Sequence, residues 1–434
     1  MRAPSSRESM IACSRKVSYV TNRPVGVAIV GMGGFAGFHR RALASLVADG
    51  RAEHVAQVAP PPDHDLFADE IGALHESGVA VHDSLRQLLA AERQKVDLLC
   101  IPTGIPLHRP MVIATCEAGV NVLVEKPAAG SIQDVDAMIT ARDRGTIACA
   151  VGFQHLYQPS THRLKRWLVE ERFGRVLRIR GFGCWPRGDD YFSRNGWAGE
   201  LAVGDTWVLD GPHNNALAHS VNLMGFLAGA TVESSASPVA ITAELYSTNP
   251  IRSADTVSLR TTTREQVEIC FAVSHATEQN TSPGFGIDTA SARLEFGFDN
   301  QLTVRWHDGR VESFDAEDQI DERSVGGAID WIAAGAPTGV DALATTPHCS
   351  LEVARTQTLI ACGSYESSAI HPLGEDLRCE GPKGEIAIRG MTDAVQDAFG
   401  QGVNFSELGL PWATPGETIS LEDYDYFPSY RTPG

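Results

Sequence analysis

The sequence predicts two domains of different class: an α/β domain with a doubly wound parallel sheet, and then an α+β domain with a large, open, mainly antiparallel sheet. Short β-branched apolar runs alternate with helical patterns over residues 25–151. Between residues 231 and 305 one strand pattern follows another. The 434 residues, 43% of them hydrophobic, are enough for two or three domains that each bury a sizeable core.

The first predicted strand, Val25 to Val30, runs into a glycine-rich turn and then a helix that includes His39 to Leu46. Gly31, Gly33 and Ala36 fit the pattern G-x-G-x-x-G/A. The first position permits the tight turn, the second lets the backbone approach a pyrophosphate, and the third keeps helix and strand close. The helix N-terminus adds free N–H groups and a partial positive charge. We therefore predict a Rossmann cradle for NAD or NADP, although glycines also end strands for structural reasons alone. The predicted cradle residues are Gly31, Gly33, Gly34, Phe35 and Ala36.

Charge and cysteine content exclude several classes of function. The formal net charge of -18 repels a nucleic-acid backbone and an anionic membrane surface. The nine cysteines are odd in number and contain no C-x-x-C pair, which favours reduced thiols in the cytoplasm over a disulfide framework or a metal site. Residues 1–23 are polar, and we expect a disordered extension there rather than a secretory signal. No apolar run approaches the length of a membrane span.

The second predicted strand, His54 to Ala59, ends in Pro60-Pro61-Pro62. An acidic residue that binds the adenosine ribose is expected here, and none is present. Asp63 and Asp65 come a little late, and no arginine follows closely to favour a 2′-phosphate. The sequence therefore leaves NAD and NADP equally open.

Two later strands place polar residues where open parallel sheets bind ligands. The strand Val96 to Ile101 is followed by Pro102, Thr103 and, a few residues on, His108. The strand Val120 to Val124 ends in Glu125-Lys126-Pro127. Shorter patterns complete this domain: a strand at 79–81 and helices at 84–91 and 111–118.

This order of motifs resembles the glucose–fructose oxidoreductase, inositol dehydrogenase and MocA family. The resemblance is dense over Val25 to Gln154, where 151–154 is similar to that family's crossing into its second domain, and continues more loosely to about Ser367. It implies a nicotinamide cofactor, a cis bond before Pro127, a sugar or polyol substrate, and a homodimer or homotetramer. The cofactor contacts that it adds to the glycine turn are Pro102, Thr103, His108, Glu125, Lys126 and Gln154.

Lys126 is a candidate catalytic residue on physical grounds as well. An ammonium beside a nicotinamide can donate a hydrogen bond to a substrate hydroxyl and lower the pKa of that hydroxyl by its charge. The alternative is a plain ion pair with Glu125, which is weakened because neighbouring strand residues point to opposite faces. For His108, a place near the nicotinamide and a role in capping the next helix remain open.

The second domain is predicted to begin with a helix, Ser160 to Glu171, and a half-exposed strand, Val176 to Gly183. The segment 185–197 that follows is rich in aromatic and polar residues. Aromatic faces and polar groups suit a sugar-like polyol, so we predict a substrate loop there; the alternative is a surface loop held by two tryptophans. Its candidate substrate-binding residues are Trp185, Arg187, Tyr191, Asn195 and Trp197.

The next candidate cluster begins at Asp210. The resemblance implies an Asp at a strand end, with a His four residues later that acts with the lysine as proton acceptor. Asp210 matches, but position 214 is Asn214, whose amide cannot take a proton. His213 is turned by about 100° on a helix, and His219 shares the face of Asn215, not that of Asn214. Three outcomes stay open: Lys126 acts as the base and Asp210 orients it, His213 substitutes for the missing histidine, or the protein does not catalyse a reaction. A role of Asp210 as a simple helix cap also stays open.

The rest of the chain returns to strands and then helices. We expect an antiparallel sheet whose free face covers the cofactor or another subunit. Helices are expected at 328–334 and 350–367, packed against the first domain, and at 391–399, followed by an acidic, aromatic docking tail at 423–427. His275 is expected to be structural. The predicted strands are 240–245, 256–261, 266–274, 291–296 and 301–305.

These predictions combine into an oxidoreductase that moves hydride between a nicotinamide and a secondary alcohol of a sugar, polyol or derivative. The substrate is expected between the domains, near Lys126 and Asp210. Two other classes stay open: an enzyme that retains NAD and cleaves glycosides through transient oxidation, and a non-catalytic sugar or nucleotide sensor. The expected domains are 1–23 (extension), 24–150 (dinucleotide-binding), 151–383 (substrate and oligomerisation) and 384–434 (C-terminal helix and tail).

Overall fold

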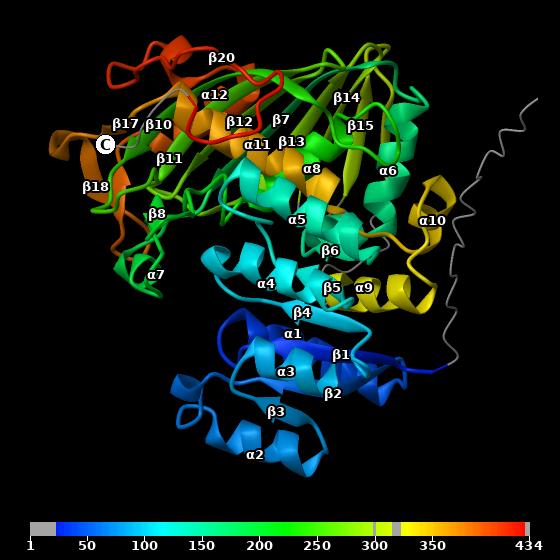
Figure 1. Ribbon diagram of the computed structural model, residues 1–434. Coiled ribbons are helices and arrows are strands. Elements are labelled where there is room, and N and C mark those ends of the chain that lie inside the picture. Colours follow the sequence, from blue (N-terminus) through cyan, green and yellow to red (C-terminus); the bar gives the residue numbers. More distant parts are fainter. Residues whose placement is uncertain (1–22, 298–300, 315–322, 430–434) are drawn as a thin grey trace, which may run out of the picture.

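Two sheets stacked through a layer of helices form the molecule, shown in Figure 1 as a computed structural model. The structure describes residues 23–297, 301–314 and 323–429. The expected N-terminal extension therefore lies, apart from Arg23, outside the described residues. In Figure 1 the blue and cyan parallel sheet lies below and the larger, mainly green sheet above.

The first sheet has six parallel strands in the order β3-β2-β1-β4-β5-β6. β1 and β4 are buried along their whole lengths, as expected for central strands covered on both faces. The strand order reverses between β1 and β4, and such a reversal opens a ligand crevice at the carboxyl ends of the strands. The doubly wound parallel sheet is thus confirmed. Its strands are β1 (Val25–Val30), β2 (Ala52–Val58), β3 (Ala80–His82), β4 (Leu98–Ile101), β5 (Asn121–Val124) and β6 (Cys149–Val151).

Helices cover this sheet, and one of them comes from far along the chain. α9 contacts α1, β1, β4 and β5, so the expected packing of a late helix against the first domain is confirmed. The helices of this part are α1 (Phe35–Ala48), η1 (Pro61–Asp63), α2 (Ala68–Glu76), α3 (Leu85–Glu92), α4 (Ile105–Glu117), α5 (Ile132–Gly145) and α9 (Arg323–Ala333).

The second sheet has ten strands, nine of them in the order β16-β15-β14-β13-β7-β12-β11-β10-β17, with β20 pairing β10. Its pairs are antiparallel except β7 with β12 and β10 with β17. Each strand expected from the sequence is present, but β13, β16 and the strands after β16 were not predicted, because they are short or rich in glycine and polar residues. The strands are β7 (Val176–Cys184), β10 (Pro238–Ser247), β11 (Thr256–Thr263), β12 (Glu268–Ser274), β13 (Thr281–Thr289), β14 (Ala292–Gly297), β15 (Leu302–Trp306), β16 (Val311–Phe314), β17 (Ile370–Pro372) and β20 (Ile419–Ser420).

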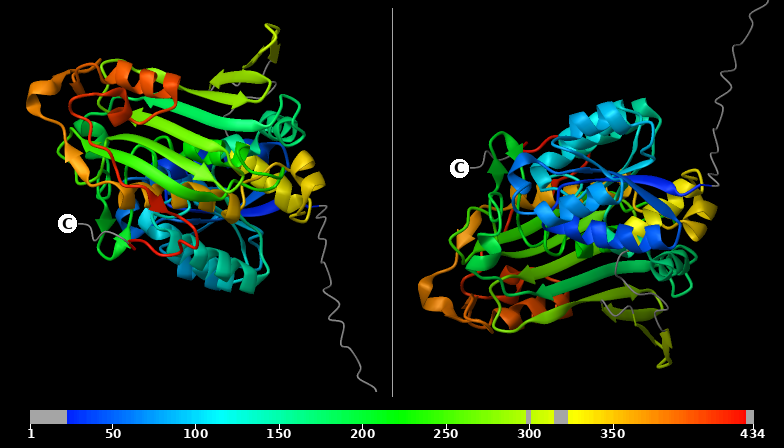
Figure 2. Two further views of the ribbon diagram at one scale, coloured as in Figure 1. Left: turned by 90° about the horizontal axis from the view of Figure 1, so that it is seen from above. Right: turned by 90° about the horizontal axis from the view of Figure 1, so that it is seen from below.

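Helices lie on both faces of the second sheet (Figures 1 and 2). α8 and α11 pack on the face toward the first sheet, whereas α12 packs on β7 and β12 from the other side. The face that we expected to be free is therefore partly covered by the chain's own C-terminal part. The remaining elements are η2 (Gln154–Tyr157), α6 (Pro159–Val169), α7 (Asp189–Phe192), β8 (Ala202–Val203), β9 (Thr206–Trp207), α8 (Ala218–Leu227), α10 (Val340–Thr345), α11 (Leu351–Ser367), η3 (Glu375–Leu377), β18 (Arg378–Glu380), β19 (Ile386–Ile388), α12 (Met391–Gln401) and η4 (Phe405–Leu408).

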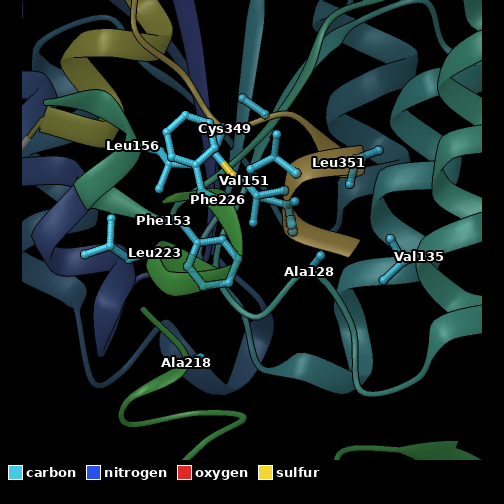
Figure 3. Close-up of a cluster of buried hydrophobic side chains, with 14 of the residues drawn as sticks. Ala128, Val135, Val151, Phe153, Leu156, Ala218, Leu223, Phe226, Cys349 and Leu351 are labelled. Carbon is cyan, nitrogen blue, oxygen red and sulfur yellow. The ribbon is translucent and has the colours of Figure 1, made fainter. Parts of the chain in front are cut away.

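The two sheets share one core at the end of β6. Figure 3 shows Val151 and Phe153 of the first sheet's edge beside Phe226 of α8 and Leu351 of α11. The backbone N–H of Val151 donates to the carbonyl of Cys349 at 2.9 Å. This continuous apolar contact fixes the end of β6 against α8, next to the segment that carries Asp210, His213 and Asn214.

The C-terminal tail docks on the chain's own body. Gln133 at the start of α5 donates to the carbonyl of Phe427 at 2.8 Å and accepts from its N–H at 3.1 Å. The Phe427 ring meets Trp207 edge to face with centroids 5.0 Å apart. The expected docking tail therefore packs against its own chain.

No helix among the described residues is both long and apolar enough to cross a bilayer. The eight cysteines of the described residues are free thiols, seven of them buried.

Candidate active site

Lys126 lies at the carboxyl end of β5, directly before a cis peptide bond to Pro127. Its Nζ donates to the main-chain carbonyl of Asn215 at 2.9 Å and to the Oδ1 of Asn215 at 3.2 Å. An ammonium has three N–H donors, so one remains for a ligand. Burial lowers the pKa of Lys126, while the carboxylates of Glu125 and Asp210 raise it in part.

The neighbouring Glu125 points the other way. Its Oε1 lies 3.0 Å from Nε2 of His39 on α1, and its carboxylate packs against the backbone of Gly152. The plain ion pair between Lys126 and Glu125 is therefore absent, and opposite-facing neighbours are the reason. Glu125 therefore links the end of β5 to α1, the helix that follows the glycine turn.

Asn215 connects Lys126 to Asp210. Its Nδ2 donates to Oδ1 of Asp210 at 2.6 Å, and Oδ2 of Asp210 accepts from the Gly199 N–H at 2.6 Å. Asp210 is buried, and desolvation raises its pKa although these hydrogen bonds oppose the change. The preceding Leu209 has a left-handed φ of 49°, a strained value for a bulky residue. The structure thus brings Lys126 and Asp210 into one hydrogen-bonded chain through an amide.

Asn214 and His213 face away from Lys126. The Nδ2 of Asn214 donates to the carbonyls of Val208 and Leu209, and its Oδ1 accepts from Gln357 on α11. Nε2 of His213 lies 2.8 Å from the Ser364 hydroxyl. Burial lowers the pKa of His213 to about 3. Neither residue is brought to the lysine.

His219 is the residue that sequence reasoning passed over. It lies on α8, four residues after Asn215, and its ring meets Phe153 and His155 near the end of β6. Nδ1 is shielded without a partner among the described residues, which leaves Nε2 as the open ring nitrogen. Burial and the Lys126 charge hold the pKa of His219 well below 6.5, so the imidazole is neutral and can accept a proton. The sequence carried no clear signal for this residue, because Asn215 lies in the turns before α8, where helical spacing does not apply.

The glycine turn fits a dinucleotide. Gly31 and Gly34 have φ values of 91° and 55°, and a Cβ on Gly34 would meet nothing within 4 Å. The N-terminus of α1 begins at Phe35. The bend therefore presents open backbone at a helix N-terminus, as the pyrophosphate of NAD requires. Gly31, Gly34 and Phe35 are the residues that would hold it.

One side chain reaches into this approach. The Phe67 ring comes within 3.0 Å of the position that a Cβ on Gly33 would occupy. Gly33 is the position at which the backbone approaches the pyrophosphate. The contact is made by the far end of the ring, so rotation of the side chain frees the approach. Nearby, Gln57 of β2 donates to the Gly31 carbonyl at 2.5 Å.

The other predicted cofactor contacts differ in how deeply their side chains are buried. His108 is buried, with Nδ1 2.9 Å from the Pro127 carbonyl and Nε2 3.0 Å from the Thr103 carbonyl. It fixes the turn after β4 to the turn after β5. Pro102 is buried, Thr103 and Gln154 are half-buried, and all three follow the ends of β4 or β6.

The 185–197 segment forms a stack of rings and guanidinium groups. Arg194 lies 3.8 Å from the centroid of Tyr191 and 3.6 Å from Oδ2 of Asp210. Trp197 packs on Gly104, in the turn after β4, which brings the segment against the first sheet's domain. Asn195 accepts from the N–H groups of Trp197 and Ala198, so its side-chain oxygen shapes the loop. Through the contact between Arg194 and Asp210, the stack continues the series of hydrogen bonds that begins at Lys126.

No group of three or more His, Cys, Asp or Glu that could hold a metal ion occurs within the ranges described.

Comparison with known proteins gives matches over both domains. Residues 25–153 match the sequence model described as "Oxidoreductase family, NAD-binding Rossmann fold", GFO_IDH_MocA. The chain is 27% identical over 216 residues to a 2,7-anhydro-N-acetylneuraminate hydratase of Mediterraneibacter gnavus, covering 49% of this chain and 51% of the relative. It is 29% identical over 200 residues to an inositol 2-dehydrogenase of Rubrobacter xylanophilus, covering 46% and 50%. The match thus spans about half the length of these curated relatives.

Solved structures share the fold over most of the chain. The WlbA dehydrogenase of Bordetella pertussis aligns with a TM-score of 0.62 at 19% identity, covering 79% of this chain and 97% of that one. A levoglucosan dehydrogenase aligns with a TM-score of 0.64 at 18% identity, covering 79% and 97%. These likenesses show the two-domain fold. Over residues 25–153 the chain matches the model of the GFO_IDH_MocA oxidoreductase family, which is described as an NAD-binding Rossmann fold.

Proposed function

We propose that this chain is an NAD(P)-dependent oxidoreductase that transfers hydride between a nicotinamide and a secondary alcohol of a sugar, polyol or sugar derivative. The observation that carries the proposal is the hydrogen-bonded chain from Lys126 through Asn215 to Asp210, with the neutral His219 in the first turn of α8, directly after the turns that contain Asn215. It lies at the carboxyl end of β5, in the crevice where doubly wound sheets bind ligands.

Each residue has a distinct part in this proposal. The nicotinamide, when bound, accepts the hydride. Lys126 uses its remaining N–H to bind the reacting hydroxyl, and its charge stabilises the oxygen as that oxygen loses its proton. Nε2 of His219 takes the proton, because a neutral imidazole with an open nitrogen can accept one. Asn215 and Asp210 fix the direction of the ammonium.

The second domain closes the site around the substrate. Trp197 already packs on Gly104 of the first domain, and Arg194, which stacks on Tyr191, lies 3.6 Å from Asp210. Aromatic rings at such a site bind the apolar side of a sugar ring. Exclusion of water by this segment would strengthen the electrostatic effect of Lys126 on the reacting oxygen.

The relatives support the substrate class. Two of the solved neighbours are complexes with NADH, one with UDP-GlcNAcA and one with levoglucosan. Inositol 2-dehydrogenase is among the curated relatives. We extend NAD binding and a sugar or polyol substrate to this chain on the strength of the shared fold and of the site geometry. The end of β2 carries neither an acidic residue nor an arginine, so the proposal covers NAD and NADP alike.

The test is reduction of NAD or NADP by a panel of sugars and polyols, followed at the nicotinamide absorbance band. Turnover with at least one member is expected. Lys126→Met should lower kcat/KM by roughly 10²-fold or more, the usual effect of removing one preorganised charge donor at an oxyanion. Lys95→Met, at an exposed lysine that pairs with Glu92, is the matched control and should leave the rate unchanged.

The same experiment separates the two other classes of function. A sensor binds sugar or dinucleotide without turnover. An enzyme with retained NAD gives no absorbance change with added cofactor, but mass spectrometry of the purified protein finds stoichiometric NAD. The sequence argument for both rested on the amide at Asn214, and the structure directs that amide to the backbone rather than to Lys126.

We also propose a cytoplasmic location and a homo-oligomer. The free thiols of the described residues support the first.

A further inference from the structure

Arg187 is a cation without a counter-charge in an acidic protein. The chain has a formal net charge of -18. Within the parts of the chain that the structure describes, Arg187 forms no ion pair, and its Nε is shielded from solvent without a hydrogen-bond partner. A half-buried guanidinium in this state leaves part of its donor capacity unused, which costs free energy unless a ligand uses it.

Aromatic rings hold this guanidinium in place. It lies 5.3 Å from the Trp185 ring centroid and 4.9 Å from that of Tyr191. A guanidinium over a ring presents its N–H groups along its own edge, where a planar or tetrahedral oxyanion can accept two of them. The rings, together with a side-chain hydrogen bond to Tyr191, thus orient Arg187 while leaving its remaining donors, Nε among them, available.

A short series of contacts joins Arg187 to the proposed reaction centre. The Tyr191 ring contacts Arg187 and also Arg194, whose guanidinium lies 3.8 Å from the same centroid. Arg194 in turn lies 3.6 Å from Asp210, the end of the chain that begins at Lys126. Asp210 neutralises Arg194, whereas no carboxylate of the described residues forms an ion pair with Arg187. Of the two arginines, Arg187 is the one left for a ligand.

We propose that the substrate is an anionic sugar, whose carboxylate or phosphate binds Arg187 while its reacting hydroxyl lies at Lys126. This rests on the proposed function and narrows its substrate class. Asp210 cannot repel the anion strongly, because Arg194 and the Gly199 N–H already bind its Oδ2. Neutral sugars would lack the group that Arg187 recognises.

Binding and turnover test the inference separately. The panel compares D-glucose with D-glucuronate and D-glucose 6-phosphate, and myo-inositol with its monophosphate and a hexaric acid. One readout is the rise in the thermal unfolding midpoint with each compound, without added cofactor. The other is kcat and KM for NAD or NADP reduction.

In the wild type, at least one acid should bind at least about tenfold more tightly than its neutral partner, because one charge-assisted hydrogen bond is worth roughly that factor. Arg187→Gln should abolish the preference, chiefly through KM. Arg310→Gln is the matched control, since Arg310 also stacks on a tryptophan, 4.6 Å from the Trp306 centroid, but lies on the β15–β16 turn. Binding of D-glucuronate or the hexaric acid would identify a carboxylate as the recognised group, and binding of the sugar or inositol phosphate would identify a phosphate.

Equal affinity for acids and neutral sugars, no midpoint rise with any acid, or an unchanged preference in Arg187→Gln would each overturn the inference. Turnover of neutral sugars with no preference for acids overturns it while the proposed function stands. If the acids bind more tightly than the neutral sugars but no compound reduces the nicotinamide, the anion site is supported and the proposed function is refuted.

Discussion

At the scale of single residues, the site depends on which side chain faces Lys126. The family resemblance placed Lys126 and Asp210 near one substrate, and the structure links the two side chains through Asn215, while their catalytic roles stay a prediction. Sequence reasoning could not predict that Asn215 lies between them, because the turns over residues 211–217 precede the regular helix α8 and shift the helical phase. The roles assigned to His213 and Asn214 stay untested, but their hydrogen bonds point them elsewhere.

Replacement of the proposed base should change the pH profile. His219→Gln is expected to lower kcat by roughly 10²- to 10⁴-fold, the range for loss of a general base. In the wild type, kcat/KM should fall on the acid side below pH 6.5 as His219 takes a proton, since its pKa is lowered. That acid limb should disappear in the variant, and imidazole should restore activity to His219→Ala. A retained acid limb in His219→Gln would assign it to another group.

The amide of Asn215 and the carboxylate of Asp210 should be able to exchange positions and keep the hydrogen bond between them. Asn215→Asp alone places two carboxylates at the 2.6 Å contact with Asp210, and like charges there should reduce both activity and stability. The double variant Asp210→Asn with Asn215→Asp keeps one of each group. It should recover activity at least tenfold over Asn215→Asp. If the double variant is no better than the single one, the hydrogen bond between these two side chains is not what orients Lys126.

At the scale of elements, local pattern predicted most of what the structure shows. The parallel strands are short, continuous apolar runs, and helices such as α11 and α12 begin within a residue of the expected positions. β13 was missed because its Ser282-Pro283-Gly284 stretch is unfavourable for a strand, and its neighbours β7 and β14 hold it in the sheet. The packing of α12 on the second face came from long-range contacts that no local pattern encodes.

The connection between β2 and α2 should control access of the dinucleotide. The Phe67 ring occupies the approach to Gly33, so Phe67→Ala is expected to tighten NAD binding. The gain is up to about tenfold if the ring leaves the approach open in one molecule out of ten. Calorimetric titration with NAD measures this. Phe38→Ala, at an aromatic residue on α1 that stacks with Phe35, is the control. Weaker binding in Phe67→Ala would mean that the ring supports the adenine instead.

At the scale of the whole molecule, the buried histidines make folding depend on pH. His162 lies on α6, with Nε2 2.7 Å from the Leu156 carbonyl, and burial lowers its pKa from 6.5 to about 4, helped by His348, Arg166 and Lys165. The unfolded chain therefore binds a proton below pH 6.5 that the folded chain does not. His162 contributes its full stability above pH 6.5 and loses it as the pH falls toward 4.

The difference in unfolding free energy between the wild type and His162→Gln should therefore shrink by about 1.4 kcal/mol per pH unit, or about 3 kcal/mol in all, between pH 6.5 and 4. Denaturant unfolding at several pH values measures it. His307→Gln, at a histidine whose side chain is exposed, is the matched control. A pH-independent difference for His162→Gln would contradict the burial argument.

The central claim is that Lys126 and His219 meet a substrate oxygen in front of the nicotinamide, and a crystal structure with NAD and a substrate tests it most directly. The account predicts that Nζ of Lys126 and Nε2 of His219 both lie within hydrogen-bond reach of one ligand oxygen. The carbon bearing that oxygen should lie about 3–3.5 Å from C4 of the nicotinamide. A nicotinamide bound away from the end of β5, or a ligand oxygen that contacts neither side chain, would contradict the account.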